Sequence, residues 1–191
     1  MRRAGFAVLV LCGLLGACGL GDPAATPTVT TDPPVVVSYV AIGGDRSGDD
    51  DPDSQRRQVW PRLLFREHLP AQAVFALLSR PGATVEEALR SQLPGALELE
   101  PTVATVWFTA GDVEQSTPVD RYRADLDELV GALADFGADV VVLFEAGTPS
   151  AYAEAAQTVA GAHGAAVVEV AEPGDQGQIA AQVAEALALP E

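Results

Sequence analysis

The 191-residue chain contains no lysine, no asparagine and only two cysteines, Cys12 and Cys18. The P-loop pattern G-x-x-x-x-G-K-S/T needs a lysine, and the dinucleotide pattern G-x-G-x-x-G is also missing, so we expect no nucleotide cofactor. The formal net charge is −16, which disfavours binding to nucleic acid. We therefore expect no cofactor and no nucleic-acid partner.

The N-terminus has the pattern of an export signal, in which two arginines precede an apolar run and a small-residue cleavage site. Its last residues, Leu15-Gly16-Ala17-Cys18, resemble the bacterial lipobox, which implies cleavage before Cys18 and lipidation of that thiol. Residues 1–17 are then a signal peptide, and Cys12 leaves with it, so no thiol remains for a disulfide, a metal or catalysis. No other apolar run reaches the roughly 20 residues that span a bilayer.

Residues 18–34 combine the lipidated cysteine with a Pro/Thr-rich segment that has no apolar periodicity, which is typical of a tether. Residues 35–191 form one domain, which we expect to be monomeric. These segments predict an exported protein, attached to the cell membrane through its N-terminal lipid, with its domain on the extracytoplasmic side. Removal of Arg2 and Arg3 makes the charge more negative still, which argues against direct adhesion to anionic lipid.

Apolar, β-branched runs alternate with segments of helical periodicity along the domain. The predicted strands are 35–43, 73–79, 103–110, 138–146 and 165–171, and the predicted helices are about 57–68, 84–99, 118–136, 150–163 and 175–188. The 118–136 helix is the clearest, with one apolar face made by Val119, Tyr122, Leu126, Leu129, Leu133 and Phe136. This alternation predicts an α/β fold: a three-layer, doubly wound, five-stranded parallel sheet of the flavodoxin-like kind.

The loops that follow parallel strands open on one edge of the sheet, where ligands bind in such folds. The first of these loops, "GGDRSGDDDPD", lacks a phosphate-binding pattern, and its acidic residues would repel a phosphate. The spacing of Asp45, Ser47 and Asp49 resembles the start of a calcium loop, but the glycine and distal glutamate of an EF-hand are not in place. A solvated acidic loop that caps the next helix is the favoured interpretation.

Five segments resemble, in order, the sequence blocks of the SGNH/GDSL hydrolases, flavodoxin-like esterases and acylhydrolases with a serine nucleophile. They are "SYVAIGGD", "PGATVEEALRSQLPGAL", "VATVWFTAGD", "YRADLDELVGALADFGADVVV" and "EVAEPGDQGQIAAQVA". The resemblance covers residues 37–188. It implies an SGNH-hydrolase-like domain and, for a typical member, ester hydrolysis.

The residues that carry the family's chemistry are replaced in this chain. In the family a first-block serine attacks the acyl carbon. Its own N–H, a second-block glycine N–H and a third-block asparagine hold the oxyanion, and a fifth-block Asp-x-x-His supplies the base. In an ungapped alignment these positions are Asp45, Ser79, Gly111, Glu169 and Glu172. The resemblance therefore implies a degenerate member.

Each replacement has a chemical cost. A carboxylate at Asp45 would form a mixed anhydride with no base to direct water at it. Loss of one oxyanion donor costs about 10²–10³ in turnover, and no asparagine elsewhere in the chain could take over this function. We predict a catalytically inactive binding or accessory module for an unknown small molecule or envelope ligand. The alternative is an ester hydrolase with a rearranged site that uses Ser47.

The two histidines offer no replacement base at this edge. His68 and His163 each precede a predicted strand, so both belong to the opposite edge of the sheet.

Carboxylates stand at or near the ends of four of the five predicted strands, and we expect them to converge on one acidic rim. The rim residues are Asp45, Asp112, Glu145 and Glu172, with Glu169 close by. Repulsion between carboxylates at short range is relieved when they pair with cationic side chains or bind a cation. Pairing with Arg46 and Arg80 is the favoured outcome, and capture of Ca²⁺ or Mg²⁺ is the alternative. The pattern itself specifies no metal site.

Overall fold

The structure of the chain, a computed structural model, describes residues 36–44 and 59–189. Contacts divide the chain into residues 1–34 and a unit from Val35 to Glu191, and the described residues all belong to the second unit. The predicted lipidation site, Cys18, and the predicted loop residues Asp45, Arg46 and Ser47 lie outside the described residues.

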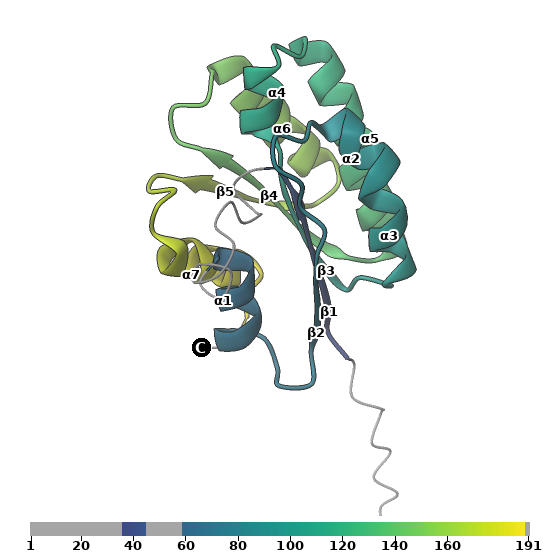
Figure 1. Ribbon diagram of the computed structural model, residues 1–191, viewed down its shortest axis with the longest axis vertical. Coiled ribbons are helices and arrows are strands. Elements are labelled where there is room, and N and C mark those ends of the chain that lie inside the picture. The colour runs from purple at the N-terminus through teal and green to yellow at the C-terminus, as the bar shows by residue number, and fades with distance from the viewer. Residues whose placement is uncertain (1–35, 45–58, 190–191) are drawn as a thin grey trace, which may run out of the picture. The chain divides into compact units, whose positions relative to one another are not determined.

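Five parallel strands form one sheet with the order β2-β1-β3-β4-β5 (Figure 1). The strands are β1 (Ser38–Gly43), β2 (Val74–Leu77), β3 (Val103–Trp107), β4 (Asp139–Glu145) and β5 (Ala166–Val170). The central strands β1 and β3 are buried along their whole length, as expected for a parallel sheet covered on both faces. The predicted α/β fold with a five-stranded parallel sheet is confirmed.

Helices cover both faces of the sheet and create two apolar cores, one on each side (Figure 1). One core lies under α1 and α7, and the other lies mainly under α2, α3, α5 and α6. The helices are α1 (Trp60–Glu67), α2 (Val85–Ser91), α3 (Leu93–Glu98), α4 (Thr109–Glu114), α5 (Val119–Phe136), α6 (Ser150–Ala162) and α7 (Gln176–Ala186). In the described ranges 36–44 and 59–189, no helix combines the length and the apolar character needed to cross a bilayer.

Two details of the helices differ from the sequence prediction. The single helix predicted over 84–99 is divided into α2 and α3 at Gln92, because Pro94 has no N–H to continue the ladder and its ring crowds the preceding turn. The strand predicted over 103–110 ends at Trp107, and the residues after it form the short helix α4. Both differences shape the edge of the sheet at which the candidate site lies.

Helix α5 matches its predicted span and buries Tyr122, Leu126, Leu129 and Leu133. Phe136 was predicted on the same buried face, but it is 47% exposed. It occupies the last helical position before Gly137, which ends the helix in the left-handed conformation.

Candidate functional site

The chain is held firmly where it leaves β1, immediately before Asp45. The Gly43 N–H donates to Gln92 Oε1 (3.1 Å), and Gln92 Nε2 donates to the Gly43 carbonyl (3.2 Å). The same carbonyl accepts the Arg80 N–H (2.9 Å), and the Gly44 N–H donates to the Trp107 carbonyl (3.0 Å). Gln92 thus acts as a substitute strand partner for Gly43 at the point where β2 ends. It is 3% exposed.

The loop after β2 and helix α4, which follows β3, meet through their backbones. A Cβ atom at Gly111 would lie 2.4 Å from the Ala83 carbonyl oxygen, 3.1 Å from the Ala83 carbonyl carbon and 3.3 Å from the Gly82 carbonyl oxygen. Real Cβ atoms do not approach backbone oxygen so closely, so no side chain fits at position 111 unless the loop or the helix moves. The asparagine that the ungapped alignment predicts at this position therefore has no room in this structure.

Sequence analysis did not identify Gly82, yet this glycine lies beside Gly111. It has a φ of +68°, which favours glycine, and its carbonyl accepts a hydrogen bond from Gln115 Nε2 (2.8 Å). The Pro81-Gly82 pair is a turn signal that could have revealed it. Ser79, the position aligned with the family's second-block glycine, is half-buried just after β2.

Asp112 is a buried residue of α4 and joins this helix to the start of α2. It is 1% exposed, and its Oδ2 accepts the Val85 N–H (3.0 Å). Burial raises the pKa of the Asp112 carboxyl above its ordinary value, against the opposing effects of the bonds from the Val85 N–H and the Thr117 side chain. The nearby carboxylates of Asp125 and Glu87 raise the pKa slightly further. Asp112 therefore has a structural position and does not lie on an open rim.

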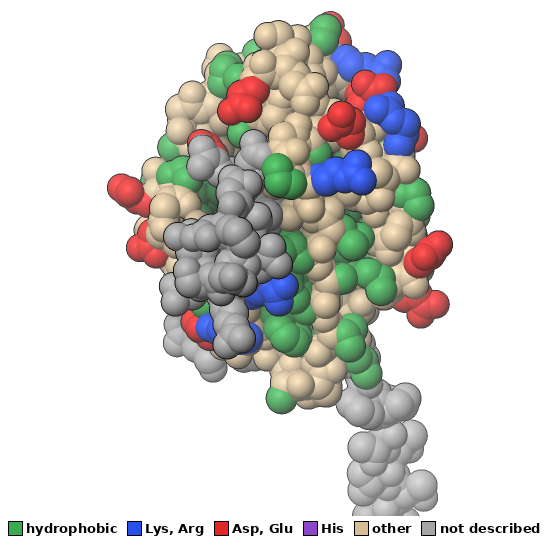
Figure 2. Space-filling view, in the orientation of Figure 1, with side chains coloured by type: hydrophobic (Ala, Val, Ile, Leu, Met, Phe, Trp, Pro, Cys, Tyr) green, Lys and Arg blue, Asp and Glu red, His purple; other side chains and the backbone are tan. Residues whose placement is uncertain are grey.

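Among the other predicted rim residues, Glu145 and Glu169 do not converge. Register pairs Phe144 with Glu169 and Glu145 with Val170, and successive residues of a strand point to opposite faces, so Glu145 and Glu169 face opposite sides of the sheet. Glu172 is exposed in the turn after β5, where its carbonyl accepts the Asp175 N–H (3.0 Å). On the face shown in Figure 2, acidic side chains are dispersed and form no single patch.

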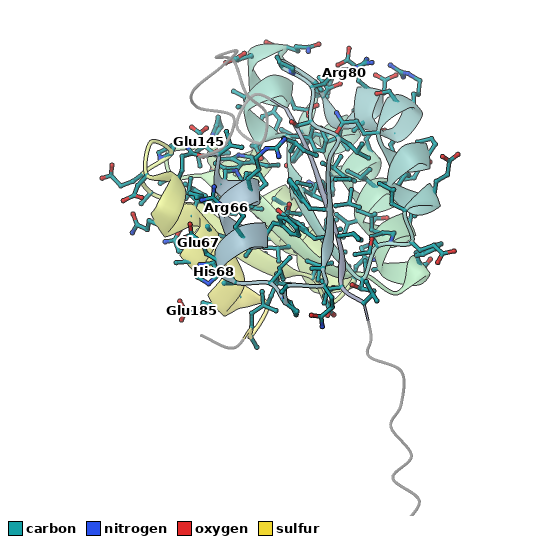
Figure 3. All side chains as sticks on the ribbon, turned by 60° about the horizontal axis from the view of Figure 1, so that its bottom comes forward. Arg66, Glu67, His68, Arg80, Glu145 and Glu185 are labelled. Carbon is teal, nitrogen blue, oxygen red and sulfur yellow. The ribbon has the colours of Figure 1, made fainter. Side chains whose placement is uncertain are left out.

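Arg46 and Asp45 lie outside the described residues, so the pairing predicted for Arg46 stays a prediction. Within 36–44 and 59–189, no three Asp, Glu, His or Cys side chains lie close enough together to hold a metal ion. Arg80 forms no ion pair with a described carboxylate. Figure 3 shows Arg80 and Glu145 well apart.

Both histidines lie at the opposite edge of the sheet, as the sequence predicted. His68 follows α1, and Figure 3 shows it at the end of the domain away from Arg80. His163 ends α6, and its Nε2 lies 2.9 Å from Asp127 Oδ1. The His163 ring packs on Gly131, since a Cβ atom at position 131 would lie 2.9 Å from the Cε1 atom of His163. This His–Asp pair links α5 to α6 and cannot act as a base at the loops that follow the strands.

The turn between β5 and α7 keeps several features of the family's fifth block. Pro173, Asp175 and Gly177 coincide with the P, D and G of the family sequence "HPNDAGH". Asp175 caps α7 by accepting the Gln178 N–H (2.9 Å). Gln176 accepts the Trp60 N–H and donates to the Pro173 carbonyl, both at 2.9 Å, so this turn is tied to the start of α1.

Trp107 ends β3 next to these contacts, and its Nε1 is a buried donor with no partner among the described residues. Its ring packs against Trp60 at a centroid distance of 6.1 Å. The described residues at this edge of the sheet include carboxylates but no histidine.

The fold and the order of these loops define the chain as an SGNH-type α/β domain. Its sequence matches the model of the GDSL-like Lipase/Acylhydrolase family over residues 38–184, and the chain belongs to that family. No curated protein matches the sequence.

Solved structures share the fold at low sequence identity. TesA is 17% identical, with a TM-score of 0.65 over 78% of this chain and 97% of that one. The psychrotrophic esterase EstA from Pseudoalteromonas sp. is 16% identical, with a TM-score of 0.65 over 79% and 96%. A lipase/acylhydrolase from Enterococcus faecalis is 17% identical, with a TM-score of 0.63 over 81% and 98%. At these identities the likeness establishes the fold alone.

Proposed function

We propose that this protein is an exported lipoprotein whose SGNH/GDSL domain binds a ligand at the carboxyl edge of the sheet without hydrolysing esters. The contact between Gly111 and Ala83 carries the proposal. The Ala83 carbonyl oxygen lies where a side chain at position 111 would have to be, which supports a site that works without the family's oxyanion-binding asparagine.

The other replacements support the same conclusion. Loss of one oxyanion donor alone reduces turnover by about 10²–10³. Glu172 stands where the family has its catalytic histidine, and both histidines of the chain lie at the other edge of the sheet. A serine or carboxylate nucleophile would therefore act without a positioned base.

In this proposal the protein is attached to the cell membrane through a lipidated Cys18, and its domain is extracytoplasmic. The ligand is a small molecule or a component of the cell envelope. The domain acts as a monomeric binding or accessory module. The N-terminal sequence supports the location, and the acidic surface supports a partner other than nucleic acid.

An ester hydrolase with a rearranged site is the second candidate. Membership of the GDSL-like family favours it, as does the retained framework of Pro173, Asp175 and Gly177. In this alternative Ser47 is the nucleophile.

A fluorophosphonate probe tests the two functions against each other, because it labels activated serines covalently. EstA is a suitable positive control, since its crystal structure has been solved in a form inhibited by monoethylphosphonate. We expect EstA to be labelled and the folded wild-type protein to remain unlabelled. Labelling of the wild type that is lost in Ser47→Ala would establish the hydrolase. Labelling that persists in Ser47→Ala would also overturn the proposal, since it would reveal another activated nucleophile.

A further inference from the structure

We infer that a hollow at the amino edge of the sheet binds an organic cation, an alkyl guanidinium or alkylammonium group. The hollow has a volume of about 410 Å³ and lies at the starts of β4 and β5, on the edge opposite the candidate site. Residues at the ends of α5, α6 and α7 line it. The inference is independent of the function proposed for the carboxyl edge.

Three helix ends give the hollow a negative potential. Each helix is followed by a residue in the left-handed conformation, namely Gly137, Gly164 and Ala188, and all three line the hollow. Each end is closed by a backbone bond back into its helix, as in the bond from the Ala138 N–H to the Leu133 carbonyl (3.1 Å). A helix C-terminus carries a partial charge of roughly −0.5, so three such ends around one space favour a cation.

The side chains of the lining add to this potential. They include the carboxylate of Asp139 and no arginine. Asp139 is exposed and forms no ion pair with a described residue. His163 is the other titratable group of the lining, and its Nε2 faces Asp127 at 2.9 Å.

The shape and polarity of the hollow favour an organic cation over a metal ion. A divalent metal needs several oxygen ligands, and no group of three metal-binding side chains exists among residues 36–44 and 59–189. Most of the lining is alanine or glycine, which leaves room for an alkyl stem beside the backbone.

Two sources can supply this chemistry: a free amine such as a polyamine, or an arginine or lysine side chain of another protein. Agmatine represents the free cation. The peptide acetyl-Leu-Arg-Leu-amide represents the protein side chain, and acetyl-Leu-Gln-Leu-amide is its uncharged control.

The test is a titration of the purified full-length chain with each probe, followed by the thermal midpoint at constant ionic strength with NaCl as the reference salt. A ligand that binds only the folded state raises the midpoint in a saturable way. We expect agmatine, the Arg peptide or both to do so, while the Gln peptide does not. A stronger effect of the peptide identifies a protein side chain as the source, and an equal or stronger effect of agmatine identifies a free cation.

Two variants locate the effect. Asp139→Asn should raise the half-saturating concentration at least threefold, whereas Asp120→Asn, which removes the same charge from an exposed residue at the other end of α5, should not change it. Ala165→Arg places a guanidinium group at the lining and should abolish the response, with folding verified by circular dichroism. The inference is overturned if no probe gives a saturable rise, or if Asp139→Asn responds as the wild type does.

Discussion

The side-chain amide of Gln92 forms two hydrogen bonds with Gly43, one to its N–H and one to its carbonyl. The Gly43 carbonyl has a second donor in the Arg80 N–H, but the Gly43 N–H depends on Gln92. This pair fixes the direction of the chain at the end of β1, immediately before Asp45.

Gln92→Met should therefore lower the free energy of unfolding by about 1–3 kcal/mol, because it keeps the approximate volume and leaves a buried N–H without an acceptor. Urea denaturation measures the change. Gln178→Met, at an exposed position of α7, is the matched control and should change stability by less than about 0.5 kcal/mol. Equal losses in the two variants would mean that the Gly43 contact contributes nothing specific.

Gly111→Ala should destabilise the fold by at least about 1–3 kcal/mol, because the added methyl group collides with the Ala83 carbonyl. Gly161→Ala is a control in another helix, α6, where a Cβ atom would meet nothing within 4 Å. That substitution should be neutral or stabilise by up to about 1 kcal/mol, since alanine is the better helix former. Opposite signs for the two changes, measured by chemical denaturation, are the expected result.

Asp112→Asn should change the dependence of stability on pH. The pKa of Asp112 is raised in the folded state above its ordinary value of 3.8, so the folded protein holds this proton more tightly than the unfolded chain does. The stability that this bound proton contributes is complete below pH 3.8, the ordinary pKa, and is lost as the pH rises through the higher pKa of the folded state. The variant lacks this loss, so its stability relative to the wild type should increase over that interval.

Urea denaturation at steps between about pH 3 and pH 7 measures this difference. Asp120→Asn is the charge-matched control, since its carboxylate is exposed to water. A difference between Asp112→Asn and the wild type that stays constant with pH would contradict the raised pKa of the buried Asp112 carboxyl.

Asp45→Ser alone should not create esterase activity. Catalytic residues of this kind act as a unit, and the variant still has Gly111 in place of the oxyanion donor and Glu172 in place of the base. Hydrolysis of a short-chain nitrophenyl ester, with EstA as the positive control, measures the outcome. Turnover above the wild-type background would mean that a working base exists near position 45.

Cys18→Ala should abolish acyl labelling and release the protein from the membrane fraction. Two or more acyl chains, at about 0.8 kcal/mol per buried CH₂, give stable anchoring, whereas one chain is marginal. Metabolic labelling with a fatty-acid analogue, followed by fractionation, measures both effects. Undiminished label and an unchanged membrane fraction in Cys18→Ala would contradict lipidation at this residue.

The sheet could be predicted from the sequence because its strands are apolar, β-branched runs, of which β1, β3 and β4 are buried over most or all of their length. The orientation of Glu145 and Glu169 follows from the alternation of side chains along a strand. Glu169 pairs with Phe144, the residue before Glu145, so the two carboxylates face opposite sides of the sheet. An acidic rim that includes Glu145 and Glu169 was predicted because both residues stand near the end of a strand. That prediction did not consider which face of the sheet each side chain occupies.

Other features depend on tertiary contacts that leave no local signal. Asp112 follows a strand and looks like a solvated loop residue, but the start of α2 covers it and supplies the Val85 N–H. Gln92 occupies a position in a helical pattern, and its role emerges only because β2 ends and leaves Gly43 without a partner on the β2 side of the sheet. Helix α4 was missed because a six-residue segment after a strand is too short to establish a period.

The close approach of Gly111 to Ala83 also limits how this edge of the sheet could be redesigned. A side chain at position 111 needs the 82–84 segment to lie farther from α4 than it does here. Gly111→Asn by itself is therefore penalised by the collision before the new amide can serve any chemistry. A usable side chain at position 111 requires coordinated changes in both segments.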